Sequence, residues 1–318
     1  MTGQDVRETE HRITVKAPAQ IVYRLLAEVP DWPLIFPPTV YAHRIEGTDR
    51  EERIQIWATA NGEAKTWVSR RELDPQRMRI RFRQEVSQPP VAAMGGTWFV
   101  EERAPGGCRV RLLHDYRAVD DDPERLRWID DAVERNSHAE LTALKHTAEL
   151  AGASADLRLS FEDTVLVNGE GKDAFDFINE AGLWSQRLPH VSRVDLREEV
   201  PGLQWLTMDT VARDGSTHTT RSVRVSFPHE RIVYKQVQVP ALMTLHTGEW
   251  LFEERTGGVA VTSRHTVAIN EANIVPVLGA GCGVEDAKAY VHAALSANSL
   301  ATLGHARAYA ESRRGVGG

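Results

Sequence analysis

Residues 98–103 read Trp-Phe-Val-Glu-Glu-Arg, and residues 250–255 read Trp-Leu-Phe-Glu-Glu-Arg. The two stretches are 152 positions apart, and the tryptophan turn at residues 31–37 returns at the same offset at residues 183–189. A period of this length indicates a tandem domain, because the repeats of solenoid proteins are far shorter. The chain is therefore expected to contain two copies of one fold.

Length and composition agree with two domains, which we expect at residues 1–152 and 153–318. Hydrophobic residues make up 42% of the chain and charged residues 26%, which is typical of a soluble globular protein. The net charge of −7 argues against a nucleic-acid binder, and no apolar run is long enough to span a membrane. With two cysteines and no signal-peptide pattern, we expect no disulfide framework, no cysteine metal cluster and a cytoplasmic location.

The first copy is predicted to contain a strand, two helical segments, six strands and a long helix. The first strand alternates at residues 11–15, and Pro18 suits the first turn of a helix because its missing N–H costs little there. A short proline-limited turn or helix follows at residues 32–38. The six strands are expected near residues 40–47, 53–60, 65–73, 78–84, 96–102 and 108–116. Acidic residues before Pro123 favour the start of a long helix that ends near Leu150.

The second copy repeats this order. Its expected elements are a strand at residues 156–167, a helix around Phe175, the Trp184 turn, strands near 191–199, 203–212, 218–227, 231–237, 246–254 and 259–269, and a helix at 285–311. Consecutive strands joined by tight turns pair antiparallel, which predicts an α+β fold with the helices on one face of each sheet. If the long helix lies inside the curl of the sheet, the space between them is an internal cavity and the default binding site.

Trp67, Ser69 and Arg71 share one face of a predicted strand, because side chains alternate along a strand. If this face points inward, a guanidinium and a hydroxyl lie against an aromatic wall. Such an arginine stays protonated and can polarise carbonyl oxygens. The alternative is a surface arginine at a sheet edge.

In the second copy, Ser222 and Arg224 correspond to this pair, since each arginine precedes a proline by four residues. Val223, Val225 and Phe227 form the apolar face of that strand. The pattern is therefore ambiguous, and it favours an Arg224 that faces solvent over one that points inward.

His114 and His265 occupy matching places on the last strand of each copy. An unperturbed histidine has a pKa of about 6.5, so either could act as a general acid or base. The alternative is a hydrogen-bonded histidine in the core or at its rim.

Two further motifs favour ordinary explanations. Arginines at 77, 79, 81 and 83 alternate with apolar residues, which predicts a solvated sheet face paired with glutamates. The sharper alternative is a docking patch for an acidic protein. The glycines at 279–283 resemble a dinucleotide-binding motif but lack its βαβ unit, so we interpret them as a flexible lead-in to the last helix.

Several features of the sequence are together similar to those of a known family. They are the duplicated unit, the Asp31-Trp32-Pro33 and Trp184 turns, Trp67-Val68-Ser69-x-Arg71, Trp98 and the long terminal helix. Over essentially its whole length the chain resembles the di-domain aromatase/cyclases of bacterial type II polyketide synthases. The resemblance implies two tandem helix-grip domains of the START/Bet v1 type, each an aromatase/cyclase domain with a curved antiparallel sheet around its long helix. Single-domain members of the family are similar in placing a tyrosine where this chain has Thr39, so tyrosine-assisted proton transfer is not expected here.

The resemblance also implies a substrate and partners. The substrate is a poly-β-ketone on the phosphopantetheine arm of an acyl carrier protein, and other type II polyketide synthase subunits are further partners. The reaction is first-ring aldol cyclisation, dehydration-aromatisation, or both, with neither a redox cofactor nor a metal. A nucleic acid or membrane partner is not expected, and a homodimer is left open.

Arg71 and Ser69, with Arg224 and Ser222 in the second copy, are the expected catalytic residues. The arginine would stabilise negative charge on an enolate or alkoxide oxygen, and the serine would orient a carbonyl or a water. The expected substrate-binding residues are Trp67, Trp98, Phe82, His114, Thr220 and His265. The alternative is a non-catalytic hydrophobic-ligand carrier or a chaperone-like binding protein for polyketide intermediates, which an apolar pocket without an internal arginine would favour.

Overall fold

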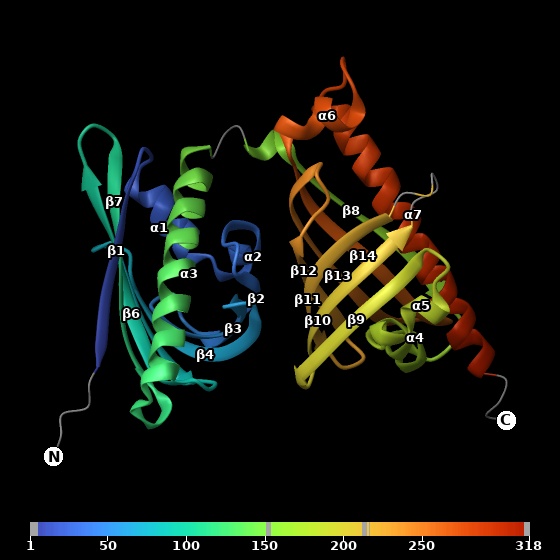
Figure 1. Cartoon of the computed structure of the whole chain (residues 1–318), viewed down its shortest axis with the longest axis horizontal. Helices are drawn as coiled ribbons and strands as arrows, with labels where there is room; N and C mark the ends of the chain where they lie inside the picture. Colours follow the sequence, from blue (N-terminus) through green and yellow to red (C-terminus); the bar gives the residue numbers. More distant parts are fainter. Residues whose placement is uncertain (1–5, 151–153, 212–214, 216, 315–318) are drawn as a thin grey trace. The chain divides into compact units, whose positions relative to one another are not determined.

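The computed structural model describes residues 6–150, 154–211, 215 and 217–314 (Figure 1). Its contacts divide the chain into two compact units, Met1–Ser154 and Ala155–Gly318. Each unit contains one seven-stranded antiparallel sheet and one long helix. Among the described residues, no helix is both long enough and apolar enough to cross a membrane.

The first unit follows the predicted order of elements. It begins with β1 (Arg7–Val15), α1 (Ala19–Ala27), a 3-10 turn η1 (Val29–Asp31) and α2 (Trp32–Ile35). Six strands follow: β2 (Thr39–Gly47), β3 (Glu51–Ala60), β4 (Glu63–Asp74), β5 (Arg79–Val86), β6 (Val91–Arg103) and β7 (Gly107–Ala118). The unit ends with η2 (Val119–Asp121) and the long helix α3 (Pro123–Glu149). The sheet order β1-β7-β6-β5-β4-β3-β2 places the first and last strands of the unit side by side.

The start of α3 has the expected cap. Asp122 precedes the helix, and its carboxylate accepts hydrogen bonds from the backbone N–H groups of Glu124 and Arg125, each at 2.9 Å. Pro123 occupies the first helical position, where no N–H is required. The cap fixes where the helix begins and therefore which of its residues face the sheet.

The second unit repeats the first with two additions, η3 before its first strand and α6 before its long helix. It comprises η3 (Ser154–Leu157), β8 (Arg158–Val167), α4 (Gly171–Asn179), η4 (Ala181–Leu183), α5 (Trp184–Arg187), β9 (Val191–Val200), β10 (Leu203–Val211), β11 (Thr217–Phe227), β12 (Arg231–Gln238), β13 (Met243–Arg255), β14 (Gly258–Ile269), η5 (Glu271–Asn273), α6 (Ile274–Leu278) and α7 (Val284–Arg313). Sheet order β8-β14-β13-β12-β11-β10-β9 matches that of the first unit.

Helix α6 and the glycines after it are the longer addition, and sequence reasoning missed this helix; η5 before it corresponds to η2 of the first unit. The helix precedes the glycines at 279–283, two of which, Gly279 and Gly281, have φ of 98° and 91°. Because of this segment, the offset between equivalent residues grows from 152 in the strands to 162 in the long helix, where Asn136-Ser137 matches Asn298-Ser299. The offset is 153 at Arg71 and Arg224 and 151 at His114 and His265, and these values with 152 and 162 define the equivalent positions used below.

Each core lies between a sheet and its helices. In the first unit Leu26 of α1 and Leu141 and Leu144 of α3 pack against Trp98 and Leu112 of the sheet, and all five are buried. In Figure 1 α3 (green) lies across one face of its sheet, and α7 (red) runs along the second sheet. The two tandem helix-grip domains predicted from the sequence are therefore confirmed.

In each sheet, one glycine lies directly against an aromatic ring of the neighbouring strand. A Cβ on Gly96 would lie 2.6 Å from Cζ of Phe82, and a Cβ on Gly248 would lie 2.6 Å from Cζ of Tyr234. Phe82 and Tyr234 are equivalent, as are the two glycines. The bare backbone thus makes room for an aromatic ring on the neighbouring strand, and it directs each ring toward the histidine of the last strand.

Candidate active site

A cavity of about 150 Å³ lies between the sheet and α3 of the first unit. Strands β2 to β7 form one wall, and α2 and α3 contribute the rest. The lining residues are Trp32, Thr39, Ile56, Ala58, Ala60, Lys65, Thr66, Trp67, Gln84, Gln88, Pro89, Pro90, Val91, Met94, His114, Trp128, Ile129, Ala132, Val133, Asn136, Ser137 and Glu140. The space exists because the strands and the helix carry alanines here, whose short side chains do not fill it.

Three tryptophans and several small residues give the cavity an apolar wall. Trp32, Trp67 and Trp128 approach it from α2, β4 and α3. Trp67 therefore lies where the sequence predicted. Thr39, which replaces the expected tyrosine, is buried and lines the cavity too, so it presents a hydroxyl and no phenol.

Glu140 is the acidic residue among those that line the cavity. It lies on the inward face of α3, eleven residues after Ile129 and seven after Val133, which both line the same cavity. Burial raises its pKa to about 8. A carboxyl in this environment keeps its proton at neutral pH and can donate a hydrogen bond.

His114 enters the cavity from β7, where it pairs with Thr9 and Gly96. Burial, aided by His11, lowers its pKa to about 4, so the ring is neutral at physiological pH. The Phe82 and His114 rings pack edge to face, with their centroids 5.6 Å apart. The Nδ1 atom of His114 has no hydrogen-bond partner among the described residues, which leaves it free to meet a ligand.

Polar groups at the rim are already engaged. The Thr66 backbone N–H donates to Oε1 of Gln88 at 3.0 Å, and the Thr66 hydroxyl donates to the Ile56 carbonyl at 2.9 Å. Lys65 lies 5.5 Å from the ring centre of Trp128 and pairs with Glu63 at 2.7 Å. These contacts fix the rim and leave Glu140 and His114 as the titratable groups of the interior.

Arg71 points inward but does not line the cavity. Its Nη2 donates to the Leu26 carbonyl at 2.8 Å, and its Nη1 pairs with Oε1 of Glu52 at 2.9 Å. Its side chain is 2% exposed, so the surface alternative is excluded. Burial lowers its pKa to about 10, although Glu52 opposes that shift. The guanidinium lies 5.0 Å from the ring centre of Trp32, and Trp32 does line the cavity.

Ser69 lies on the same inward face and is also buried outside the lining. Glu52 bridges Arg71 and Arg44, whose Nε lies 2.9 Å from its Oε2. The predicted group Trp67, Ser69 and Arg71 thus shares a face, but only Trp67 reaches the cavity.

Arg224 does not face solvent, so that expectation was wrong. It is 2% exposed, donates to the Ile178 carbonyl at 2.7 Å and lies 5.1 Å from the ring centre of Trp184. Both faces of β11 are buried at residues 222–225, so apolar alternation could not tell which face points inward. Ser222 and Thr220 share the inward face with Arg224 and are buried.

The second arginine differs from the first in its partner. Gln204 stands at the position of Glu52 and donates to Oε2 of Glu198 at 2.8 Å and to the Asn179 carbonyl at 3.3 Å. Nε of Arg224 has no hydrogen-bond partner among the described residues. Burial lowers the Arg224 pKa to about 10.

His265 lies in a buried polar network inside the second unit. Its Nδ1 is 2.9 Å from Nε2 of His246 and 3.1 Å from the Tyr234 hydroxyl. Its Nε2 is 2.7 Å from the Ser299 hydroxyl and 3.0 Å from that of Ser263. Burial lowers the pKa of His265 to about 4 and that of His246 to about 3, so both rings are neutral.

Trp98 and Phe82 belong to the core. Trp98 is 8% exposed and packs with Leu112 and Ile80, and it is not among the cavity-lining residues. Phe82 packs against the same core and reaches the cavity only through its contact with His114.

The basic strand is a paired, solvated face, as expected. Arg77 and Arg79 meet Asp74, at 3.0 and 3.7 Å. Arg81 meets Glu72 at 3.9 Å, and Arg83 meets Asp115 at 2.5 Å. These neighbours offset the positive charge of the ladder, which weakens its case as a docking patch.

Sequence reasoning missed Glu140. The available signal was a glutamate in the apolar stripe of a long helix, at helical spacing from Ile129 and Val133. A charged residue inside such a stripe is either paired or functional, because burial without either is costly.

The fold and cavity define a helix-grip protein with an interior binding site, and the comparisons specify its family. A family model described as polyketide cyclase/dehydrase and lipid transport matches residues 6–149. The granaticin polyketide synthase bifunctional cyclase/dehydratase of Streptomyces virginiae is 51% identical over 93% of this chain and 97% of its own length. The actinorhodin polyketide synthase bifunctional cyclase/dehydratase of Streptomyces coelicolor is 46% identical over 96% and 98%.

A solved structure extends the likeness to both units. The di-domain ARO/CYC BexL from the BE-7585A biosynthetic pathway is 60% identical and superposes with a TM-score of 0.84, covering 96% of this chain and 99% of its own. StfQ, the di-domain ARO/CYC from the steffimycin pathway, has the same TM-score at 36% identity and the same coverage. The chain belongs to the di-domain polyketide cyclase/dehydratase (ARO/CYC) family.

Proposed function

We propose that this protein is a polyketide aromatase/cyclase that folds, cyclises and dehydrates a carrier-protein-bound poly-β-ketone in the cavity of its first unit. The observation that carries the proposal is an apolar cavity that presents one carboxyl, Glu140, and one neutral imidazole, His114. Membership of the cyclase/dehydratase family supports the reaction class.

The cavity acts first by proximity. A poly-β-ketone has methylene groups activated by carbonyls on both sides, and its many conformers rarely bring the correct pair together. Trp32, Trp67 and Trp128 restrict the chain to a bent path, which raises the effective concentration of one methylene at one carbonyl. The wall therefore selects the ring that forms.

Glu140 then moves the protons. A pKa of about 8 leaves a minor fraction of Glu140 as carboxylate at neutral pH. This fraction takes a proton from the methylene, and the resulting enolate carbon forms a bond to the distant carbonyl carbon. The protonated Glu140 returns that proton to the new alkoxide oxygen. In the dehydration, Glu140 takes a proton from the ring carbon and delivers it to the departing hydroxyl, which leaves as water. Glu140 finishes each step in its starting form, so the protons balance.

His114 stabilises the oxygen on which charge develops. Its neutral ring carries one N–H group, which can donate a hydrogen bond to that oxygen. Arg71 acts through Trp32 in this proposal: it holds the end of α1 and the Trp32 ring, and so positions one wall of the cavity. Arg224 holds α4 and Trp184 in the same manner, which makes both arginines positioning residues.

One observation favours the alternative of a non-catalytic carrier. The described cavity lining contains no arginine, and an apolar pocket without one was expected of a carrier. A carrier, however, gains nothing from burying a carboxyl beside an imidazole, because desolvating Glu140 costs stability. Glu140 therefore separates the two functions.

The test is reconstitution with a minimal type II polyketide synthase and product analysis. Glu140→Gln keeps the size of the side chain and removes its proton, and the yield of aromatic product should fall by about 100-fold or more in favour of shunt products. Glu124→Gln, at an exposed position of the same helix, is the control and should leave the yield unchanged. A folded Glu140→Gln protein with full yield would support the carrier instead.

A further inference from the structure

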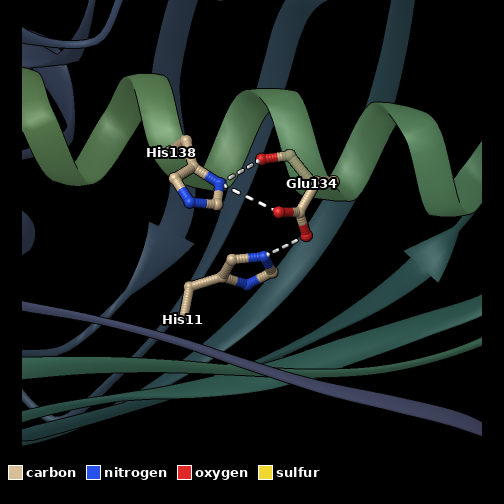
Figure 2. Close-up of side chains that lie close together, drawn as sticks. All are labelled: His11, Glu134 and His138. Carbon is tan, nitrogen blue, oxygen red and sulfur yellow. Dashed lines mark hydrogen bonds and ion pairs between the residues drawn. The ribbon is translucent and has the colours of Figure 1, made fainter.

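A second cluster of chemistry-bearing side chains lies in the first unit, outside the cavity lining. Nε2 of His11, on β1, is 2.8 Å from Oε2 of Glu134, on α3. Nδ1 of His138, one helical turn further along α3, is 3.3 Å from Oε1 of the same carboxylate. Figure 2 shows both rings next to the Glu134 carboxylate, one from the strand and one from the helix. The three ligand atoms lie within 4.8 Å of one another.

His11 is not satisfied as an ordinary core histidine. It is 8% exposed, and its Nδ1 has no hydrogen-bond partner among the described residues. Its contacts are the Glu134 carboxylate, through Nε2, and the edge of the His138 ring, whose centroid is 5.3 Å away. Nε2, the nitrogen on the Glu134 side, is therefore the atom that His11 would offer to a ligand.

The second unit shows what a purely structural contact at this place looks like. The positions equivalent to His11, Glu134 and His138 are Asp163, Ser296 and Leu300. The Ser296 hydroxyl donates to Asp163 at 2.7 Å, and Leu300 is exposed. One hydrogen bond therefore suffices to join the first strand to the long helix, so the two histidines and the glutamate of the first unit need another explanation.

We propose that His11, Glu134 and His138 form a binding site for one divalent transition-metal ion of the Zn²⁺ class. Zn²⁺ binds imidazole nitrogens and carboxylate oxygens at about 2.0–2.2 Å, so neighbouring ligand atoms around a tetrahedral ion are roughly 3.4 Å apart. Nε2 of His11 lies 2.8 Å from one Glu134 oxygen and Nδ1 of His138 lies 3.3 Å from the other, and the three ligand atoms lie within 4.8 Å of one another, so small side-chain rotations would bring them to that spacing. Mixed nitrogen and oxygen ligands select a transition ion over Ca²⁺ or Mg²⁺, which take oxygen ligands.

The site would be half open and mainly structural. Glu134 and His138 are exposed, which gives an ion access and leaves a fourth position for water. The ion would clamp β1 to α3 on the side of the helix that faces away from Glu140. Because other residues of α3 line the cavity, the clamp would stiffen one cavity wall without touching the reacting atoms.

The test is calorimetric titration of the tag-free, full-length protein with Zn²⁺. We expect saturable binding of one ion per chain, and a rise in the unfolding midpoint of about 5–10 °C at a 100-fold excess over the dissociation constant. His138→Leu, which installs the residue found at Leu300, should weaken binding at least about 10-fold, and Glu134→Gln should do the same. Co²⁺ should show the d–d absorption of a low-coordinate site in the wild type only.

The matched control is His146→Leu, an exposed histidine two turns further along α3. It should leave the affinity unchanged. Ca²⁺ and Mg²⁺ should not compete. The proposal is overturned if Zn²⁺ shows no saturable binding, or if His138→Leu and Glu134→Gln bind it as the wild type does, since the ion would then lie elsewhere.

Discussion

Where the first unit has Glu140, the second has Thr302, and where the first has Glu52, the second has Gln204. Both units nonetheless bury an arginine that donates to the carbonyls at the end of the first helix and lies over a tryptophan. The feature common to both copies is therefore a structural anchor, and the ionisable interior groups are what differ. In the proposed function, acid–base chemistry therefore belongs to Glu140 and not to the arginines.

The interiors differ in polarity as well. The first unit holds a cavity with Glu140 and His114 in its wall. In the second unit, the ring nitrogens of His265 are within hydrogen-bonding distance, 3.1 Å or less, of His246, Tyr234 and Ser299. The same scaffold thus supports an open site in one copy and a hydrogen-bonded core in the other. The following predictions test this difference.

The largest expected effect is on stability at the two arginines. Arg71→Met leaves Glu52 buried with Arg44 as its remaining ion-pair partner, and we expect the first unit to lose about 3–5 kcal/mol. Arg224→Met leaves no buried carboxylate behind and removes hydrogen bonds to two carbonyls, so the second unit should lose about 1–3 kcal/mol. Urea unfolding followed by hydrogen exchange in peptides of each unit measures both losses. Equal losses of stability in the two variants would mean that the buried Glu52 carboxylate does not add to the cost of removing Arg71.

The second prediction concerns acid. His246 and His265 have folded pKa values of about 3 and 4, below the unfolded value of about 6.5, so folding favours their neutral forms. Their stabilisation is complete above pH 6.5 and is lost as the pH falls toward 4, at about 1.4 kcal/mol per pH unit for each ring. His114 is the corresponding buried ring of the first unit. The second unit should therefore lose protection from hydrogen exchange first on acidification.

His246→Asn supplies the control for this prediction. It removes one of the two neutral rings of the network and should reduce the acid sensitivity of the second unit by about half. If both units lose protection in parallel in the wild type and the variant, the buried histidines do not set the acid limit.

Much of the fold could be read from the sequence because turns and alternation are local. Strand boundaries agree within a few residues, and the cap at Asp122 fixed the start of α3. Helix α6 was missed because five helical residues, Ile274–Leu278, are too few to show a periodic stripe.

The site was less predictable because it depends on contacts distant in sequence. Trp67 and His114 line the cavity, and their role in substrate binding stays a prediction. Arg71 finds its partners in α1 and β3, which alternation cannot reveal. Alternation also failed for Arg224, since both faces of β11 are buried. His11 and Glu134 are separated by 123 residues, so no spacing rule could join them.

The third prediction fills the cavity. Ala132→Leu adds three carbons to the inward face of α3, where the alanine lines the cavity, and should slow cyclisation several-fold while costing about 1–3 kcal/mol of stability. Ala294 is the equivalent residue of α7 and is exposed, so Ala294→Leu should change neither activity nor stability by much. Product yield in the reconstituted system and thermal unfolding measure both. Equal effects of the two variants would place the substrate outside this cavity.

The smallest effect is expected at the starts of the long helices, which the two units cap differently. Asp122 accepts two backbone N–H groups of α3, whereas α7 begins after Gly283, whose N–H donates to Asp286 at 2.8 Å. Asp122→Ala removes the acceptor for two orphaned donors and should cost about 1 kcal/mol. Asp286→Ala removes a single contact to a flexible glycine and should cost less. Hydrogen exchange of the first turn of each helix reports the two losses separately. A larger loss in α7 would mean that the reach of Asp286 back to Gly283 holds its helix more firmly than the direct cap of Asp122 holds α3.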